Sequence, residues 1–170
     1  MFDTNVFNRI LDKVLTIDAL NGQVNAHATH IQRDEIMRTP DDERRKALEA
    51  VFTNVTGAGV PTSSLVVGVS RVGAARIGAK RIVSTSSAVW DVSAWGLAKW
   101  SADDNLYTPI KTDLDALNNG KKNNVEDALI AETAIKDGYV LVTDDRDLAA
   151  ITKKYHGECL SVRELLQRIK

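Results

Sequence analysis

The chain has 170 residues, of which 44% are hydrophobic and 26% charged, so it fits a single globular domain with a substantial core. Its formal net charge of −1 excludes overall attraction to nucleic acid, so contact with a polyanion needs a local basic patch. A single cysteine, Cys159, excludes an internal disulfide and a thiolate metal site; with no leader or membrane-spanning run evident, the cytoplasm is the expected compartment.

The first half of the chain alternates short extended segments with helical ones. Apolar residues recur at helical spacing from Val6 to Val14, behind Asn5, which is a good N-cap residue. Thr39-Pro40, followed by three acids, is typical of a helix start with proline in the first helical position. The expected segments are a strand ending at Asp3, a helix from Asn5 to about Leu15, an extended segment over 24–28, a helix over 31–38 and a helix that begins at Pro40.

The stretch between about Val55 and Ser101 is rich in Gly, Ser, Thr and Ala and has no clear periodicity. All three tryptophans of the chain lie in it, which argues against disorder. We therefore expect an ordered insertion at about 55–101 within one domain, with a strand over Leu65–Val69.

Strands and helices alternate again after Tyr107. The run Tyr139–Thr143 is almost entirely apolar, as buried parallel strands are. The expected segments are helices over 110–117 and 124–136, a strand over 139–143, a helix over 145–155, a strand over 159–161 and a last helix through Ile169. This order predicts an α/β fold with a central parallel sheet.

Two acids stand out by their positions. Asp3 lies at the carboxyl end of the first strand, the edge at which ligand sites of open α/β sheets gather. Asp127 shares a helical stripe with Ile130, Ala131 and Ala134, so it is expected to face inward or to line a cleft. The alternative for Asp127 is a half-exposed acid in the first helical turn, where the helix dipole favours negative charge.

Two further acidic positions are less clear. Asp144, Asp145 and Asp147 follow the predicted strand. Asp144 as an N-cap with Asp147 three residues later resembles a capping box, which makes Asp145 the candidate for the cleft, although spacing does not decide among them. Glu35 is preferred to the neighbouring Asp34 because it shares a helical stripe with an apolar residue.

Carboxylates at these positions suit Mg²⁺ or Mn²⁺, hard cations that take oxygen ligands. The three histidines, His27, His30 and His156, are too scattered to suggest zinc. A divalent pair would neutralise charge on a phosphodiester and activate water. No serine or cysteine nucleophile motif and no glycine-rich phosphate loop are present.

Four short motifs, in this order along the chain, resemble those of the PIN-domain ribonuclease family. They are Phe2-Asp3-Thr4-Asn5-Val6, Gln32-Arg33-Asp34-Glu35-Ile36, Asp127-Ala128-Leu129-Ile130-Ala131 and Leu141-Val142-Thr143-Asp144-Asp145. Each is short, but four in the right order are fairly specific. The resemblance implies a three-layer α/β/α fold with a central parallel sheet, formed by residues 1–170 as one domain.

The resemblance also implies a site and its chemistry. The catalytic acids of the family match four positions, Asp3, Glu35, Asp127 and Asp145. The three aspartates among them would hold Mg²⁺ or Mn²⁺. Asn5 and Thr143 match positions that orient the acids by hydrogen bonds. The implied activity is metal-dependent cleavage of phosphodiester bonds in single-stranded RNA.

Many members of this family are VapC-type toxins of toxin–antitoxin pairs, which form homodimers and are silenced by a small antitoxin protein. The partners implied are RNA, an antitoxin and a second copy of the chain. This chain is longer than is typical of such toxins, and the extra length falls in the insertion. An insertion there could occupy the antitoxin's docking place or select a different RNA.

Four basic residues of the insertion, with no acid among them, are Arg71, Arg76, Lys80 and Arg81. A nuclease with an acidic centre needs such a rim to hold the RNA backbone. The tryptophans of the insertion could stack on unpaired bases. The alternatives are a solvated charged face and tryptophans in a core or dimer interface.

Two other functions stand beside the ribonuclease hypothesis. A phosphatase of the haloacid-dehalogenase kind requires an aspartate two residues after its nucleophilic aspartate, and Asn5 occupies that position here. The other is a non-catalytic protein of the same fold that acts as a scaffold through protein or RNA partners. Acids at all four positions argue against the scaffold without excluding it.

Overall fold

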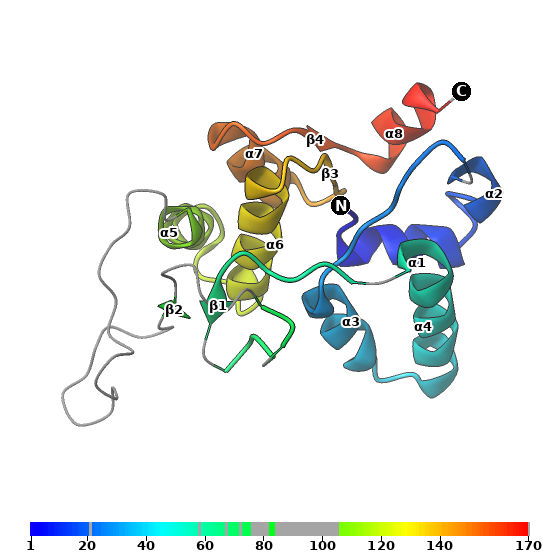
Figure 1. The fold of residues 1–170 in the computed structure, drawn as a ribbon, viewed down its shortest axis with the longest axis horizontal. Coiled ribbons are helices and arrows are strands. Elements are labelled where there is room, and N and C mark those ends of the chain that lie inside the picture. Colours follow the sequence, from blue (N-terminus) through cyan, green and yellow to red (C-terminus); the bar gives the residue numbers. More distant parts are fainter. Residues whose placement is uncertain are drawn as a thin grey trace.

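The computed structural model describes residues 1–20, 22–57, 59–66, 68–71, 73–75, 82–83 and 106–169. These residues form a mixed α/β structure of eight helices and four short strands. The helices are α1 (Thr4–Leu11), α2 (Ile17–Leu20), α3 (His30–Met37), α4 (Asp42–Thr56), α5 (Tyr107–Asn118), α6 (Asn124–Lys136), α7 (Arg146–Lys154) and α8 (Val162–Arg168), and the strands are β1 (Leu65–Val66), β2 (Ile82–Val83), β3 (Leu141–Val142) and β4 (Cys159–Leu160) (Figure 1).

A small parallel sheet joins the two ends of the chain. β3 pairs in parallel with β4, and on its other edge Val142 forms a parallel bridge with Phe2. Backbone hydrogen bonds continue outward from there: Phe2 N–H donates to the carbonyl of His27 at 2.8 Å, and Val60 N–H donates to that of Ala28 at 2.9 Å. The extended segment expected over 24–28 therefore lies beside the first residues of the chain.

Hydrophobic side chains form a cluster on each side of these strand segments. Met1, Leu141 and Cys159 belong to one cluster with α5, α6 and α7. Phe2 and Val142, the next residues along, belong to the other, with α1, α3 and α4. Successive side chains of a strand point to opposite faces. Helices consequently cover both faces, and Figure 1 shows the two helix groups on opposite sides of β3.

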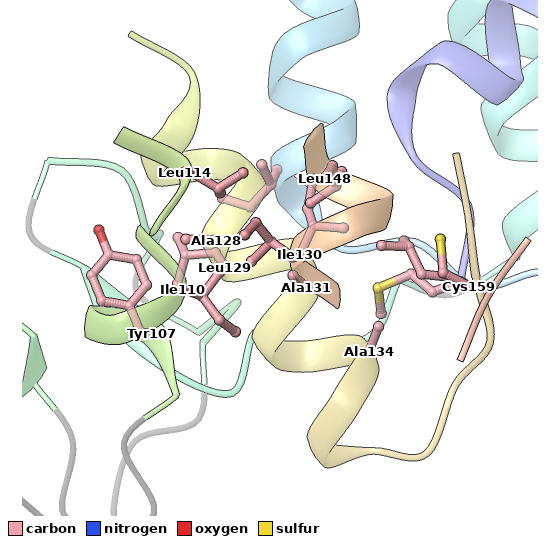
Figure 2. Packing of buried hydrophobic residues seen from close by; sticks show 14 of the residues in the cluster. Tyr107, Ile110, Leu114, Ala128, Leu129, Ile130, Ala131, Ala134, Leu148 and Cys159 are labelled. Atoms are coloured by element: carbon pink, nitrogen blue, oxygen red, sulfur yellow. The ribbon is translucent and has the colours of Figure 1, made fainter. Parts of the chain in front are cut away.

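Helix α6 is the most enclosed element. Asn124 and every residue from Glu126 to Ala134 are buried, as expected of a helix with neighbours on all sides. Figure 2 shows Ile110 and Leu114 of α5 against the apolar face of α6. Acids carried by the first turn of such a helix are necessarily held inside the protein.

The first helix starts and ends at residues other than those predicted. The N-cap of α1 is Asp3, not Asn5: its carboxylate accepts a hydrogen bond from the N–H of Thr4. An aspartate so placed satisfies a free N–H of the first turn as well as an asparagine does. The helix ends at Leu11, a turn before the predicted end, and Val14 is 52% exposed.

Helix α4 starts later than predicted. Asp41 is its N-cap and accepts from the N–H of Arg44 at 2.8 Å, so the helix begins at Asp42. Pro40 precedes the cap and does not occupy the first helical position. The acids that follow it do lie in the first turn, as predicted.

The elements expected after Tyr107 are confirmed in type and order, with ends that shift by a few residues. In the insertion, the strand predicted over Leu65–Val69 is reduced to β1, which pairs in parallel with β2. Trp90, Trp95 and Trp100 lie outside the described residues. None of the helices within the described ranges is long and apolar enough to cross a membrane.

Candidate functional site

Asp3 lies at the carboxyl end of the first strand segment, as predicted, and is 6% exposed. Its two carboxylate oxygens accept hydrogen bonds from three groups. Thr4 N–H donates to Oδ1 at 2.7 Å, while Asn5 Nδ2 and the Thr143 hydroxyl both donate to Oδ2 at 2.6 Å. Burial raises the pKa of Asp3, the hydrogen bonds from Thr143 and Thr4 oppose that rise, and Asp145 adds to it.

Thr143 connects Asp3 to the turn that follows β3. Its hydroxyl donates to Asp3, and the same oxygen accepts from Asn5 Nδ2 at 2.9 Å and from the N–H of Asp145 at 3.0 Å. A hydroxyl has one donor and two acceptor positions, and all three are used. Asn5 and Thr143, identified from sequence, thus fix the relative positions of two of the predicted acids.

Asp145 is the N-cap of α7. Its Oδ1 accepts from the backbone N–H groups of Asp147 at 2.8 Å and Leu148 at 3.0 Å. The N-cap role predicted for Asp144 is therefore wrong. The sequence analysis assigned the N-cap to Asp144 and the place in the cleft to Asp145. In the structure, Asp145 caps the helix, and its charge also raises the pKa values of Asp3 and Asp127.

Asp144 has a structural role instead. Its Oδ1 accepts from the N–H of Val162 at 3.1 Å and its Oδ2 from Nε of Arg9 at 2.9 Å. These contacts tie the turn after β3 to the start of α8 and to α1. Its charge also contributes to the raised pKa of Asp3, but less than that of Asp145.

Glu35 of α3 turns toward Asp3 and not toward solvent. The hydroxyl of Thr4 donates to its Oε2. Burial raises the pKa of Glu35, and the charges of Asp3 and Glu126 raise it further. The neighbouring Asp34 forms an ion pair with Arg71 instead, so the two acids face different surroundings, and Glu35 is the one beside the predicted acids.

Asp127, in the first turn of α6, is 7% exposed. Nδ2 of Asn123 donates a hydrogen bond to Oδ2 of its carboxylate at 3.0 Å. Burial, followed by the charges of Asp3, Glu35, Asp145 and Glu126, raises the pKa of Asp127 to about 8. The sequence alternative of a half-exposed acid at a helix start is excluded by this burial.

Glu126 is an acid that the sequence reasoning missed. It is buried beside Asp127 and forms an ion pair with Arg38, Nη1 to Oε1 at 3.0 Å. The signal was present, because Glu126 shares a helical stripe with Leu129, Ile130 and Thr133, as Asp127 does with its own apolar neighbours. A helix that is buried on all sides can hold acids inside the protein on more than one stripe.

Five acids from four separate segments therefore influence one another. We refer to them as the acid cluster: Asp3, Glu35, Glu126, Asp127 and Asp145. Within the described residues, Glu126 is the one member that forms an ion pair. Buried carboxylates without a countercharge are costly, so the cluster is an arrangement that packing alone does not favour.

The donor atoms of the cluster are all carboxylate oxygens, the chemistry that Mg²⁺ and Mn²⁺ prefer. However, no group of three or more histidine, cysteine or acidic side chains in the described part of the chain is placed to hold a metal ion together. Mg²⁺ usually binds through one or two carboxylates and keeps several waters. The donor set thus fits such an ion, while no ligand geometry follows from it.

Of the four predicted RNA-binding residues, Arg71 lies within the described residues. Its Nε and Nη2 contact the two oxygens of Asp34 at 3.0 and 2.5 Å, and 61% of its side chain is exposed. Arg76, Lys80 and Arg81 lie outside the described residues. Their role in RNA binding stays a prediction.

Comparisons of the chain with protein-family models, with curated proteins and with solved structures find no significant match. The acid cluster and its surroundings are therefore the features of the molecule that indicate a function. Three properties of the cluster matter most: its acids come from distant segments, three of the five (Asp3, Glu126 and Asp127) are buried and the other two half-buried, and hydrogen bonds orient them.

Proposed function

We propose that the chain is a metal-dependent endoribonuclease that cleaves phosphodiester bonds in single-stranded RNA. The observation that carries this proposal is the burial of Asp127, 7% exposed, near acids of three other segments, Asp3, Glu35 and Asp145, whose charges together with burial raise its pKa to about 8. Titratable groups perturbed in this way by burial and by like charges are typical of functional sites. Asp3, Glu35 and Asp145 are also the acids that the PIN-domain resemblance singles out.

The fold we propose is the three-layer α/β/α arrangement of that family. Its support is the parallel pairing of Phe2, β3 and β4 together with the helix groups on both faces. In such sheets, ligands bind at the carboxyl ends of the strands. Asp3 and Asp145 follow closely after two neighbouring strand segments, at that edge.

Mg²⁺ or Mn²⁺ would be held by carboxylates of the three aspartates that the resemblance implies, Asp3, Asp127 and Asp145, with one or two of them bound at a time and waters in the remaining positions. In Asp127 and Asp145 one oxygen is anchored, Oδ2 by Asn123 and Oδ1 by the backbone of α7. The other oxygen of each has no hydrogen bond to any described residue and is available as a ligand. When bound, the cation supplies charge that stabilises the developing negative phosphodiester and assists deprotonation of water.

The remaining groups orient and move protons. Asn5 and Thr143 hold Asp3 through Oδ2. The Thr4 hydroxyl fixes Oε2 of Glu35, which leaves Oε1 to accept a proton from the attacking water. The raised pKa of Glu35 suits this role, because a general base works best when its pKa approaches the operating pH.

The test is cleavage of labelled single-stranded RNA by the purified protein in Mg²⁺ or Mn²⁺ and in EDTA. We expect metal-dependent cleavage that falls by about 100-fold or more in Asp127→Asn. Asp113→Asn is the matched control, since Asp113 is an acid of α5 that pairs with Lys154 and takes no part in the cluster. Its activity should equal that of the wild type.

Failure of the wild type to cleave several RNAs, together with no metal binding by calorimetry, would remove the ribonuclease proposal. The non-catalytic scaffold would then be the leading function. The toxin role, an antitoxin partner and a homodimer are predictions that rest on the resemblance alone. Isolation of the chain with a small bound protein would support the first two.

A further inference from the structure

Arg38 follows the last residue of α3 and lies beside the acid cluster. Its Nη1 donates to Oε1 of Glu126 at 3.0 Å, and its positive charge opposes the rise in the pKa of Glu35. The side chain of Arg38 is 63% exposed, whereas that of Glu126 is 11% exposed. The guanidinium therefore extends from the solvent to the edge of the cluster.

Most of the hydrogen-bonding capacity of Arg38 is unused within the described residues. A guanidinium has five N–H donors, and the contact with Glu126 involves one nitrogen. Arg71 differs, because two of its nitrogens contact the two oxygens of Asp34. Arg38 thus retains donors for a ligand, while the carboxylate of Asp34 already occupies the fork of Arg71.

Electrostatics favour an anion at this place. RNA that reaches the acid cluster meets several buried carboxylates, which repel its phosphates. A guanidinium at the edge offsets that repulsion and matches a phosphate group in shape, with two parallel N–H donors. Glu126 keeps the guanidinium at the cluster, since its buried carboxylate attracts the arginine.

We propose that Arg38 binds a phosphate of the substrate other than the one that is cleaved, and that Glu126 positions Arg38 for this contact. The inference rests on the proposed function of the same site. It identifies the substrate class as a strand that continues past the scissile bond and supplies a second phosphate. A substrate with a single phosphodiester would lack this contact.

Arg33 offers a matched control on the same helix. It is an arginine of α3 with 55% of its side chain exposed, and it pairs with Glu49 of α4 at 3.2 Å. Its partner is itself 37% exposed and lies outside the acid cluster. Replacement of Arg33 removes the same charge from the same helix without touching the proposed phosphate contact.

The first measurement is binding of labelled oligouridine and oligoadenosine in Mg²⁺ over a salt titration. The protein carries Asp127→Asn, which prevents cleavage. For single strands, each phosphate contact contributes about 0.7 to the slope of log K against log salt. We expect Arg38→Gln to reduce that slope by about 0.7 and to weaken binding equally for both sequences, because a phosphate contact carries no base information. Arg38→Lys and Arg33→Gln should keep the slope.

The second measurement is steady-state cleavage with Asp127 restored. Arg38→Gln should raise KM for a long strand and leave kcat within about two-fold, as expected when binding is lost equally in the ground and transition states. Thermal melts of Arg38→Gln and Arg33→Gln separate binding from folding. An unchanged salt slope in Arg38→Gln, with or without a lower melting temperature, overturns the inference.

The outcomes also separate this inference from the proposed function. Cleavage by the wild type with an Arg38-independent salt slope overturns the phosphate contact and leaves the ribonuclease intact. Binding that depends on Arg38 without any cleavage supports the contact and overturns the ribonuclease. The absence of both cleavage and RNA binding overturns both.

Discussion

Asp3 and Asp127 are buried to nearly the same degree, 6% and 7% exposed, in very different surroundings. At the strand edge, Asp3 accepts hydrogen bonds from Thr4, Asn5 and Thr143. At the start of α6, the carboxylate of Asp127 accepts a hydrogen bond from Asn123. Hydrogen bonds to the charged form favour that form. Burial raises the pKa of both acids, and at Asp3 the hydrogen bonds from Thr143 and Thr4 oppose that rise.

The largest expected effect of this difference is a gain in stability from Asp127→Asn in the metal-free protein. The pKa of Asp127 rises from its ordinary value of 3.8 to about 8 in the fold. Between these values the folded chain holds a proton that the unfolded chain has released, so the free energy of unfolding of the wild type falls as the pH rises through this window. At pH 7 this loss amounts to about 4 kcal/mol, because one unit of pKa corresponds to about 1.4 kcal/mol. Asp127→Asn has no charge at this position, so its free energy of unfolding should be higher by that amount.

Urea unfolding in EDTA at several pH values checks this expectation. The gain should become small near pH 4 and vanish below about pH 3, where both the folded and the unfolded wild type carry the proton. The amide oxygen introduced by Asp127→Asn can still accept the hydrogen bond from Asn123, so the fold is retained. An equal gain at pH 4 and pH 8 would contradict the role of charge.

The second effect is stabilisation of the wild type by Mg²⁺, which follows from the proposed function. A ligand that binds the folded state alone contributes about 2.7 kcal/mol at 100-fold excess over Kd. Asp127→Asn should gain much less, because a ligand oxygen and a charge are lost together. Thermal melts in MgCl2, with NaCl of equal ionic strength as the control, measure both. Equal shifts in the two proteins would place the ion elsewhere.

The same substitution at the strand edge should stabilise the protein less than Asp127→Asn does, because it removes a buried charge, whose pKa is also raised, but breaks hydrogen bonds as well. Asp3→Asn replaces an accepting oxygen with an NH2 group, and both oxygens of Asp3 already face donors. A donor facing a donor in a buried site leaves both unsatisfied, for a loss of about 1 kcal/mol. Urea unfolding at pH 7 compares this variant directly with Asp127→Asn. A gain in Asp3→Asn as large as that in Asp127→Asn would contradict the contribution of these hydrogen bonds.

The smallest effect concerns the hydroxyl that holds Glu35. Thr4→Val removes the donor to Glu35 Oε2 with little change in shape, and should lower the free energy of unfolding by about 0.5 kcal/mol. Thr53→Val is the control, since Thr53 bonds to a backbone carbonyl on an exposed part of α4. The pH at which cleavage is half-maximal should rise in Thr4→Val, because the donor that lowers the pKa of Glu35 is gone. An unchanged pH profile would separate Glu35 from the chemistry.

Sequence patterns predicted the order of the elements after Tyr107 but not α2, and they identified four of the five acids of the acid cluster. Asp3 was identified from its place after a strand, and Asp127 from its helical stripe, because both signals are local. The choice among Asp144, Asp145 and Asp147 was not local: it depends on α8 and α1, whose Val162 and Arg9 occupy the carboxylate of Asp144. No spacing within the run carries that information.

Glu126 and Arg38 show a second limit. Their pairing joins the first turn of α6 to the residue after α3, so it depends on how two helices pack. Single-helix periodicity identifies the face of Glu126 but not its partner. The predicted start of α1 was wrong for a simpler reason. Asp3 and Asn5 are both good N-cap residues, and the strand before Asp3 decides between them.

The sheet has a consequence for the stage of synthesis at which a newly made chain completes the acid cluster. Phe2 pairs with Val142, and the Thr143 hydroxyl reaches Asp3 across 140 positions. A nascent chain that has emerged only through α6 carries Asp3, Glu35 and Asp127 but lacks the strand and the turn that bring Asp145 to them. Contacts of such long sequence separation form late. The acid cluster is therefore completed only after β3 and the turn through Asp145 have left the ribosome, and a translation product that stops before Asp145 cannot assemble it.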